Sequence, residues 1–172
     1  GTIDTKSAID IDDPRQVVKK PIKGDIEFRN VWFKYSTREK QILENFNLKI
    51  DASKKIALVG PSGCGKSTVL ALLQRFYDVD QGEILIDGVN IKDYDLTHLR
   101  RTYGVVSQEP VLFNVTIEYN IKYGKEDATD EEMREAAARA NALGFIEKNE
   151  FDQIEDAAEA AKKYGTGFQR KV

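Results

Sequence analysis

Hydrophobic and polar positions alternate in the first part of the chain. Residues 26–29 alternate apolar and charged side chains, and residues 46–50 repeat the same period of two. A period of two predicts a β-strand with one buried face. The segment 32–35 lies between these stretches and is a further strand candidate. Strands this close in sequence predict a small antiparallel sheet over residues 25–54.

The pattern changes at residues 56–59, sequence IALV, which are apolar without alternation. Such a run is typical of a strand buried on both faces of a parallel sheet. The glycine-rich stretch GPSGCGKST, residues 60–68, follows directly. After it, Val69, Leu72 and Phe76 fall on one face of a helical period. The sequence therefore predicts a strand, a glycine-rich turn and an amphipathic helix in that order.

Strand and helix patterns alternate further along the chain. Residues 82–88 and 103–107 are predicted strands, and residues 95–101 between them are predicted to form a short polar helix. This alternation is typical of an α/β domain.

The last third of the chain has a helical character. Thr129 and Glu132 have the spacing of a capping box, and residues 131–142 are rich in strong helix formers. Residues 152–163 predict another helix, which two nearby glycines would end.

Composition narrows the class of protein. The 172 residues are 41% hydrophobic, which is enough for the core of one domain. The net charge of −3 gives no general attraction to nucleic acid or to an anionic membrane. Cys64 is the single cysteine, so no disulfide within the chain is expected and a reducing compartment fits. No apolar stretch approaches the ~20 residues of a membrane span.

The start of the chain is polar. Residues 1–24 contain two prolines and a basic pair, which predicts a linker into a domain that begins at residue 25. The chain begins at Gly1, and Met133 is its single methionine. We therefore expect the sequence to be an excised piece of a larger protein.

The stretch GPSGCGKST matches the phosphate-loop pattern G-x-x-x-x-G-K-[S/T]. Its glycines let the backbone approach an anion, and the next helix directs the positive end of its dipole to the same point. Lys66 adds a positive charge for the outer phosphates, and the Ser67 hydroxyl is suited to Mg²⁺. The residues expected to bind the nucleotide here are Gly60, Pro61, Ser62, Gly63, Cys64, Gly65, Lys66, Ser67 and Thr68.

The alternative for this stretch is a chance glycine-rich turn without a ligand. Its place between a predicted buried strand and an amphipathic helix argues for the phosphate site. For Cys64, a redox role at the helix N-terminus competes with a small side chain that fills a tight loop, and we favour the filler.

Two further residues bear on the class of nucleotide site. Tyr35 ends a predicted strand well before the loop, where its ring could stack on adenine; a structural strand-end tyrosine is the alternative. Gln108, in the stretch SQEPVLF, follows a predicted buried strand, where its amide could contact Mg²⁺ or orient a water molecule. Neither residue alone identifies the kind of nucleotide-binding protein. Their order and spacing around the glycine-rich loop narrow the choice among phosphate-loop families.

Residues 24–124 resemble the nucleotide-binding domain of ATP-binding cassette (ABC) transporters, closest to the exporter branch that holds the multidrug-resistance P-glycoproteins. The matching stretches are GDIEFRNVWFKYSTR, LVGPSGCGKSTVLALLQRFYD, GEILIDGVNIKD, LRRTYGVVSQEPVLFNVTI and NIKYG. The resemblance implies an incomplete α/β domain with a P-loop NTPase (RecA-like) core, an antiparallel β-subdomain and part of the helical subdomain. The implied ranges are 1–24 for a linker from the membrane domain and 25–172 for the truncated domain, divided into 25–54, 55–108 and 109–172.

The same resemblance implies ligands and roles. ATP and Mg²⁺ are the implied cofactors. Tyr35 matches the aromatic residue that stacks on adenine, and Arg38 and Ile42 match residues that flank the nucleotide. Gln108 matches the glutamine that senses Mg²⁺ and the γ-phosphate and couples to the membrane domain. The implied catalytic residues are Lys66 and Gln108, and the implied metal ligands are Ser67 and Gln108.

The resemblance also implies partners and a location. The partners are the transmembrane domains of the same transporter and a second nucleotide-binding domain in a head-to-tail dimer, with no nucleic acid. The location is the cytosolic face of a membrane, and the activity is substrate export powered by ATP hydrolysis.

The chain departs from the family pattern after Gln108. Family members continue with a signature LSGGQ, an acidic Walker B strand that ends in a catalytic glutamate, and a switch histidine, and none of these occurs here. His98, the single histidine, lies upstream and is expected to be a solvated surface residue. We therefore expect ATP binding with little or no turnover. We also expect open apolar sheet edges, and hence a partly unfolded, swapped or proteolysed piece.

Two local departures accompany this one. Residues 145–172 form a longer link than is usual in the family, with a helical stretch AAEAAKKYG. The family's Glu-Asn pair before Ile121 is here Tyr119-Asn120, which is expected to alter contact with the coupling helix of the membrane domain.

Three other classes of protein stay open on the residues alone. A soluble ABC-class ATPase of DNA repair or translation is disfavoured by the linker and by the exporter-type stretch SQEPVLF. A P-loop kinase or GTPase is disfavoured by Tyr35 and by the lack of an N-K-x-D motif. A fragment without any nucleotide role is disfavoured by the intact Lys66 and Ser67.

Overall fold

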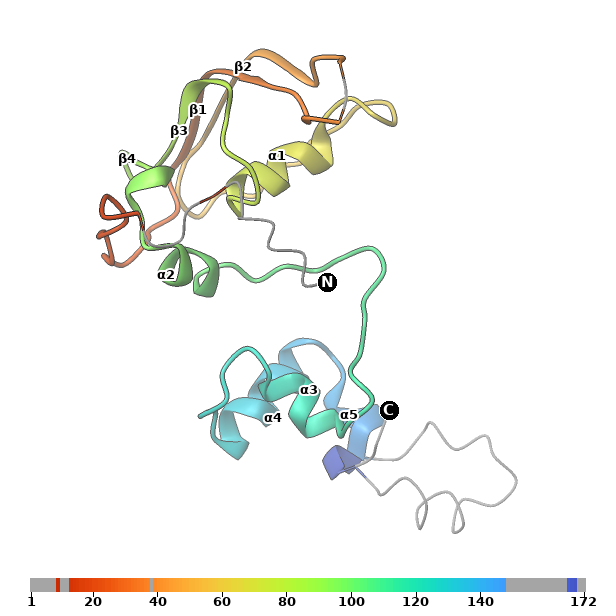
Figure 1. Ribbon diagram of the computed structural model, residues 1–172. Coiled ribbons are helices and arrows are strands. Elements are labelled where there is room, and N and C mark those ends of the chain that lie inside the picture. The colour runs from red at the N-terminus through yellow and green to blue at the C-terminus, as the bar shows by residue number, and fades with distance from the viewer. Residues whose placement is uncertain (1–8, 10–12, 38, 148–166, 170–172) are drawn as a thin grey trace, which may run out of the picture. The chain divides into compact units, whose positions relative to one another are not determined.

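The computed structural model describes residues 9, 13–37, 39–147 and 167–169. The chain divides into two compact units, Gly1–Gly104 and Val105–Val172. Figure 1 colours the described residues from red at the N-terminus to blue at the C-terminus. The finer division expected from the sequence, at residues 24, 54 and 108, stays a prediction.

The first unit is built on a four-stranded sheet with the order β2-β1-β3-β4, in which all neighbours are antiparallel. Phe28 of β1 pairs with Leu48 of β2 on one side and with Ile84 of β3 on the other. The antiparallel sheet expected from the alternating pattern is confirmed. Of the strand expected at 32–35, the first two residues are the end of β1 and the last two have no strand assignment. The strands are β1 (Ile26–Phe33), β2 (Leu43–Ile50), β3 (Gln81–Ile86) and β4 (Val89–Asn90).

A tight turn at Asp87-Gly88 joins β3 and β4. Both residues have positive φ, 50° and 75°, as a two-residue hairpin turn of type I′ requires. The Asp87 carboxylate also accepts hydrogen bonds from the N–H groups of Lys23, Gly24 and Asp25, at 2.6, 3.1 and 2.9 Å. The strand expected over 82–88 therefore ends two residues early, because Asp87 and Gly88 form the turn.

Two helices cover the core of the first unit. They are α1 (Lys66–Leu73) and α2 (Leu96–Arg101), and a short 3-10 turn, η1 (Ile91–Asp93), leads from β4 toward α2. The buried face of α1, with Val69 and Leu72, packs in one cluster with Phe28 and Val31 of β1. The expected helix at 95–101 is confirmed as α2. The helix expected after the glycine-rich loop is confirmed as α1, but it ends at Leu73, and Phe76, expected on its apolar face, lies beyond it and is 51% exposed.

Two expected strands are absent from the described residues. Residues 56–59 and 103–107 have no strand assignment and pair with no strand in the described part of the chain. Val59 is 91% exposed and Val106 is 99% exposed. A parallel strand obtains its hydrogen bonds only from neighbouring strands, so an apolar run without such a neighbour stays extended and unpaired. This part of the prediction is wrong.

The polar segment that precedes β1 packs on the first unit. The N–H groups of Val17 and Val18 donate to the Asp93 carbonyl at 3.1 and 3.0 Å, and Asp95 donates back to the Val18 carbonyl. The ring nitrogen Nε2 of His98 lies 2.9 Å from the Lys20 carbonyl oxygen. His98 is partly exposed, so the expectation of a solvated surface residue holds only in part: the preceding segment contacts its ring.

The second unit is helical. Its core contains Ile117, Met133, Ala137, Ile146 and Phe168. The expected capping box is confirmed at Thr129 and Glu132, and α4 begins there and ends at Arg139, three residues before the expected end. The helix expected over 152–163 lies outside the described residues. The elements are α3 (Ile117–Lys122), α4 (Asp130–Arg139), α5 (Leu143–Glu147) and the 3-10 turn η2 (Gly167–Gln169).

Candidate functional site

The glycine-rich loop ends at Gly65, which begins α1 in a left-handed conformation with φ of 97°. A Cβ added there would lie 3.0 Å from the Leu43 side chain and 3.4 Å from Cγ2 of Ile42. Both the conformation and the close approach of β2 therefore require glycine at this position. The expected flanking residue Ile42 is thus placed directly against the loop.

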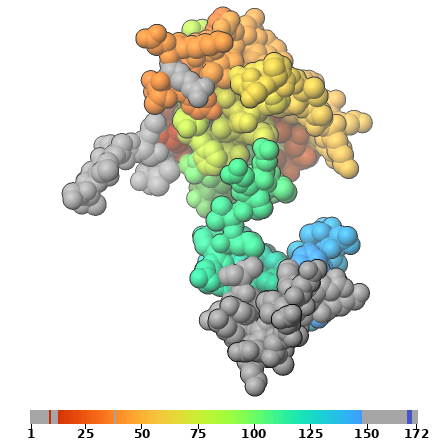
Figure 2. All heavy atoms as spheres, turned by 90° about the vertical axis from the view of Figure 1, so that its right-hand side faces the viewer, coloured from red at the N-terminus to blue at the C-terminus, as the bar shows by residue number. Residues whose placement is uncertain are grey.

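The N-terminus of α1 has no side-chain cap. The first N–H groups of a helix have no partner within the helix, so an uncapped N-terminus presents donors and the positive end of the helix dipole. The loop residues Pro61, Ser62 and Gly63 are exposed, and Figure 2 shows this yellow segment at the surface of the first unit. The geometry fits an anion such as phosphate.

Lys66 spans the loop. Its ammonium donates to the carbonyl oxygens of Gly60 and Pro61 at 2.7 and 2.8 Å, and lies 3.5 Å from Sγ of Cys64. The positive charge therefore lies inside the turn of the loop. The Ser67 hydroxyl, on the first turn of α1, is exposed and accessible to a metal ion.

Cys64 fills the turn of the loop. A Cβ added to Gly60 would lie 2.7 Å from the Cys64 sulfur, so this side chain occupies the space next to the glycine. Cys64 is an exposed free thiol. These contacts are those of a small side chain that fills a tight loop.

Tyr35 is joined directly to the first turn of α1, which follows the phosphate loop. Its hydroxyl lies 3.1 Å from Oγ1 of Thr68, which is only 5% exposed. The Tyr35 ring makes edge contacts with Phe33 and Tyr77, with centroids 5.0 and 5.1 Å apart. The structure therefore places this ring beside the first turn of α1, and its stacking on adenine stays a prediction.

A hollow of about 500 Å³ adjoins the loop, a volume typical of ligand pockets. Lys40 lines it and adds a second ammonium near the loop. The sequence analysis missed Lys40, because a lysine in a polar turn carries no signal that distinguishes it from other surface lysines. The residues that line the hollow are Lys40, Gln41, Ile42, Glu44, Ser62, Gly63 and Cys64.

Two expected site residues lack a described contact with the loop. Gln108 lies in the second unit, in a turn that the Ser107 hydroxyl closes by donating to the Glu109 carbonyl at 3.0 Å. Its contact with Mg²⁺ stays a prediction. Arg38 lies outside the described residues. In the described part of the chain, no three His, Cys, Asp or Glu side chains gather as a metal site.

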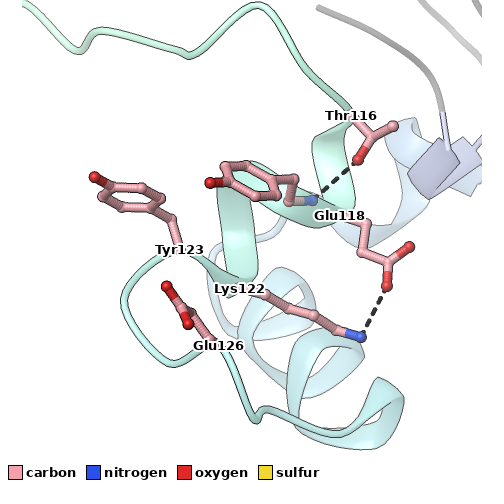
Figure 3. Close-up of a pocket in the computed structure, with 6 residues that line it drawn as sticks. Thr116, Glu118, Lys122, Tyr123 and Glu126 are labelled. Atoms are coloured by element: carbon pink, nitrogen blue, oxygen red, sulfur yellow. Dashed lines mark hydrogen bonds and ion pairs between the residues drawn. The ribbon is translucent and has the colours of Figure 1, made fainter.

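The second unit has a pocket of its own, of about 440 Å³. Its ion pairs centre on Lys122, whose ammonium lies 2.8 Å from both Glu118 and Asp130. The hydrogen bond from Lys122 lowers the pKa of the Glu118 carboxyl. Figure 3 shows this pair and, apart from it, the side chain of Glu126 below Tyr123. The lining residues are Thr116, Glu118, Tyr119, Lys122, Tyr123 and Glu126.

Aromatic side chains line and adjoin this pocket. Tyr123 contacts Phe113 and Tyr119, with ring centroids 4.6 and 6.0 Å apart. The preceding stretch is exposed, with Val111 at 86% and Leu112 at 61%. The second unit therefore presents an apolar and aromatic surface of the kind that contacts a protein partner.

No described helix is both long enough and apolar enough to cross a bilayer.

Comparisons with known proteins agree with this geometry. Residues 43–172 match the model of the ABC transporter family. The chain is 51% identical over 147 residues to ABC transporter B family member 21 of Arabidopsis thaliana, covering 85% of the chain and 11% of that protein. It is 50% identical over 145 residues to ATP-binding cassette sub-family B member 5 of Homo sapiens, covering 84% of the chain and 12% of that protein.

A solved structure is similar as well. A bacterial Atm1-family ABC exporter with ATP bound superposes with a TM-score of 0.73 and 38% identity, over 91% of this chain and 24% of that one. The chain thus spans only about a tenth of the length of the two relatives above, 11% and 12%.

Proposed function

The chain belongs to the ABC transporter family, and from this premise we propose that it is the ATP-binding module that powers an exporter of the multidrug-resistance type. The observation that carries the proposal is the hydrogen bond between Tyr35 and Thr68, which joins an aromatic ring to a phosphate loop. A nucleotide matches both features, because its base can contact the aromatic ring and its phosphates can bind at the loop. The similar transporters and exporter argue against a soluble ATPase of DNA repair or translation.

Each residue of the loop has a role in this proposal. The uncapped N–H groups of α1 and the Lys66 ammonium bind the phosphates, and Thr68 adds a hydroxyl near the inner phosphate. Mg²⁺ bound with ATP supplies charge neutralisation at the phosphates, and Ser67 and Gln108 would hold it. Tyr35 provides a face for adenine, and Ile42 and Arg38 would flank the nucleotide.

We propose that this chain alone binds ATP but does not hydrolyse it at a steady rate. Lys66 and Gln108 would contribute to catalysis, but the sequence contains no signature LSGGQ and no switch histidine. A positioned general base and complementary charge at the transition state supply much of the acceleration in phosphoryl transfer. We propose that a second nucleotide-binding domain completes the site in a head-to-tail dimer.

The second unit is proposed to contact the transmembrane domains of the transporter. The aromatic and apolar surface formed by Val111, Leu112, Phe113, Tyr119 and Tyr123 supports this contact. Such a module would lie at the cytosolic face of a membrane, and its net charge of −3 provides no general attraction to nucleic acid.

The test is ATP affinity of the 172-residue chain by isothermal titration calorimetry in the presence of Mg²⁺. We expect Lys66→Ala to weaken binding by about tenfold or more, because a charge-assisted contact to phosphate is lost. Lys49→Ala is the matched control, since Lys49 lies on β2 with a 71% exposed side chain. Equal affinity of Lys66→Ala and wild type would contradict the proposal, and steady ATPase activity that Lys66→Ala abolishes would contradict the absence of turnover.

A further inference from the structure

The end of α1 fixes the backbone just before Tyr77. Arg75 has a φ of 50°, and its N–H donates to the Leu72 carbonyl at 3.0 Å, which closes the helix. Its guanidinium, in a residue only 3% exposed, donates to Asp78 and to the Lys92 carbonyl at 3.2 Å each. A buried arginine with two side-chain hydrogen bonds therefore anchors this turn.

The end of β1 fixes the backbone just after Tyr77. The N–H of Asp80 donates to the Trp32 carbonyl at 2.9 Å, and the Asp80 carboxylate accepts from the Lys34 N–H at 2.9 Å. Among the described residues the Tyr77 hydroxyl has no hydrogen-bond partner. The ring of Tyr77 is thus positioned by the backbone anchors on both sides and not by its own hydroxyl.

This fixed ring lies against the ring of Tyr35. The centroids of Tyr77 and Tyr35 are 5.1 Å apart at an angle of 87°, and Tyr77 also contacts Phe33 at 5.7 Å. Phe33 contacts Tyr35 in turn, at 5.0 Å and 82°. Tyr35 is therefore held by two rings and by the hydrogen bond between its hydroxyl and that of Thr68. Edge-to-face contacts of this kind have a preferred geometry, so they orient a ring as well as stabilise it.

We propose that Tyr77 is a positioning residue of the nucleotide site, which holds the Tyr35 ring in the orientation that accepts the adenine base. The inference rests on the proposed nucleotide site and assigns it a determinant of base recognition. We expect Tyr77 to act on the base rather than on the phosphates, because its ring contacts among the described residues are to Tyr35 and Phe33, which lie outside the glycine-rich loop.

The test compares two ligands of the 172-residue chain, ATP and inorganic tripolyphosphate, which lacks the base. We expect Tyr77→Ala to weaken ATP binding about threefold to tenfold and to leave tripolyphosphate binding within about twofold, since an aromatic pair is worth a modest factor. Tyr77→Leu, which keeps apolar volume at the site, should show the same selective loss. Tyr77→Phe is the matched control and should bind both ligands as wild type does, because the Tyr77 hydroxyl is not used.

The outcomes separate this inference from the function on which it rests. If wild type binds neither ligand, the nucleotide site is refuted and the role of Tyr77 falls with it. If wild type prefers ATP and Tyr77→Ala keeps the same preference, only the role of Tyr77 is refuted. Equal loss of both ligands in Tyr77→Ala and Tyr77→Leu would show a merely structural residue and would also overturn the inference.

Discussion

Gly82, at the start of β3, tests the packing of the sheet independently of any ligand. Its φ is 80°, and a Cβ added there would lie 2.7 Å from the Asn30 carbonyl carbon and closer still to the carbonyl oxygens of Arg29 and Asn30. A side chain that is forced to adopt positive φ costs about 1–2 kcal/mol. The overlap with the β1 backbone adds about 1–3 kcal/mol, because β1 cannot yield without shifting its pairing.

We therefore expect Gly82→Ala to lower the free energy of unfolding by about 2–5 kcal/mol. The matched control is Gly88→Ala, because Gly88 has φ of 75° but no atom within 4 Å of the added Cβ. It should lose only the backbone contribution, about 1–2 kcal/mol.

Urea denaturation followed by tryptophan fluorescence measures both variants. Trp32 is the single tryptophan and pairs with Gln81, so it reports on the β1–β3 ladder next to the substitution. A lower urea midpoint for Gly82→Ala than for Gly88→Ala is expected. Coincident midpoints would refute the steric reasoning, because the two sites differ in the space around the added Cβ.

Two further predictions concern local electrostatics and capping. Thr129→Ala removes the side-chain acceptor for the Glu132 N–H at the start of α4 and should destabilise the second unit by about 1 kcal/mol in thermal denaturation, whereas Thr129→Ser should be nearly neutral. Burial raises the pKa of Asp87, but three backbone N–H donors outweigh it and hold the pKa below its ordinary value of 3.8. The Asp87 carboxylate therefore stabilises the first unit above pH 3.8, and this stabilisation is lost as the pH falls through the lowered pKa. In Asp87→Asn, the free energy of unfolding of the first unit should depend less on pH in the acid range. An unchanged pH dependence would contradict this role of Asp87.

Local signals in the sequence predicted a large part of the fold. Alternation placed β1 and β2, and the spacing of Thr129 and Glu132 placed the start of α4. These features succeed because each depends on neighbours within a few residues. The glycine-rich loop also carries a local signal, since its glycines, lysine and serine lie within nine residues, but its binding of phosphate stays a prediction.

Features that depend on distant partners could not be predicted. The run at 56–59 has the composition of a buried strand, but its conformation depends on a neighbouring strand that the run itself cannot specify. His98 contacts the Lys20 carbonyl, 78 residues away in sequence, and no local pattern indicates this. Tyr77 was missed in the same way, because its role depends on the ring of Tyr35 across the unit.

The hydrogen bonds of Lys66 have a consequence for which anions the loop accepts. Its ammonium already donates to the Gly60 and Pro61 carbonyls, so an incoming anion competes with the protein for the same three N–H donors. A single small anion would replace these two carbonyls as an acceptor but would reach few other donors. In the proposed site, a polyphosphate would also reach the N–H groups of α1 and the Ser67 hydroxyl. If the loop binds phosphate as proposed, we therefore expect it to discriminate by the length of the phosphate chain as well as by charge.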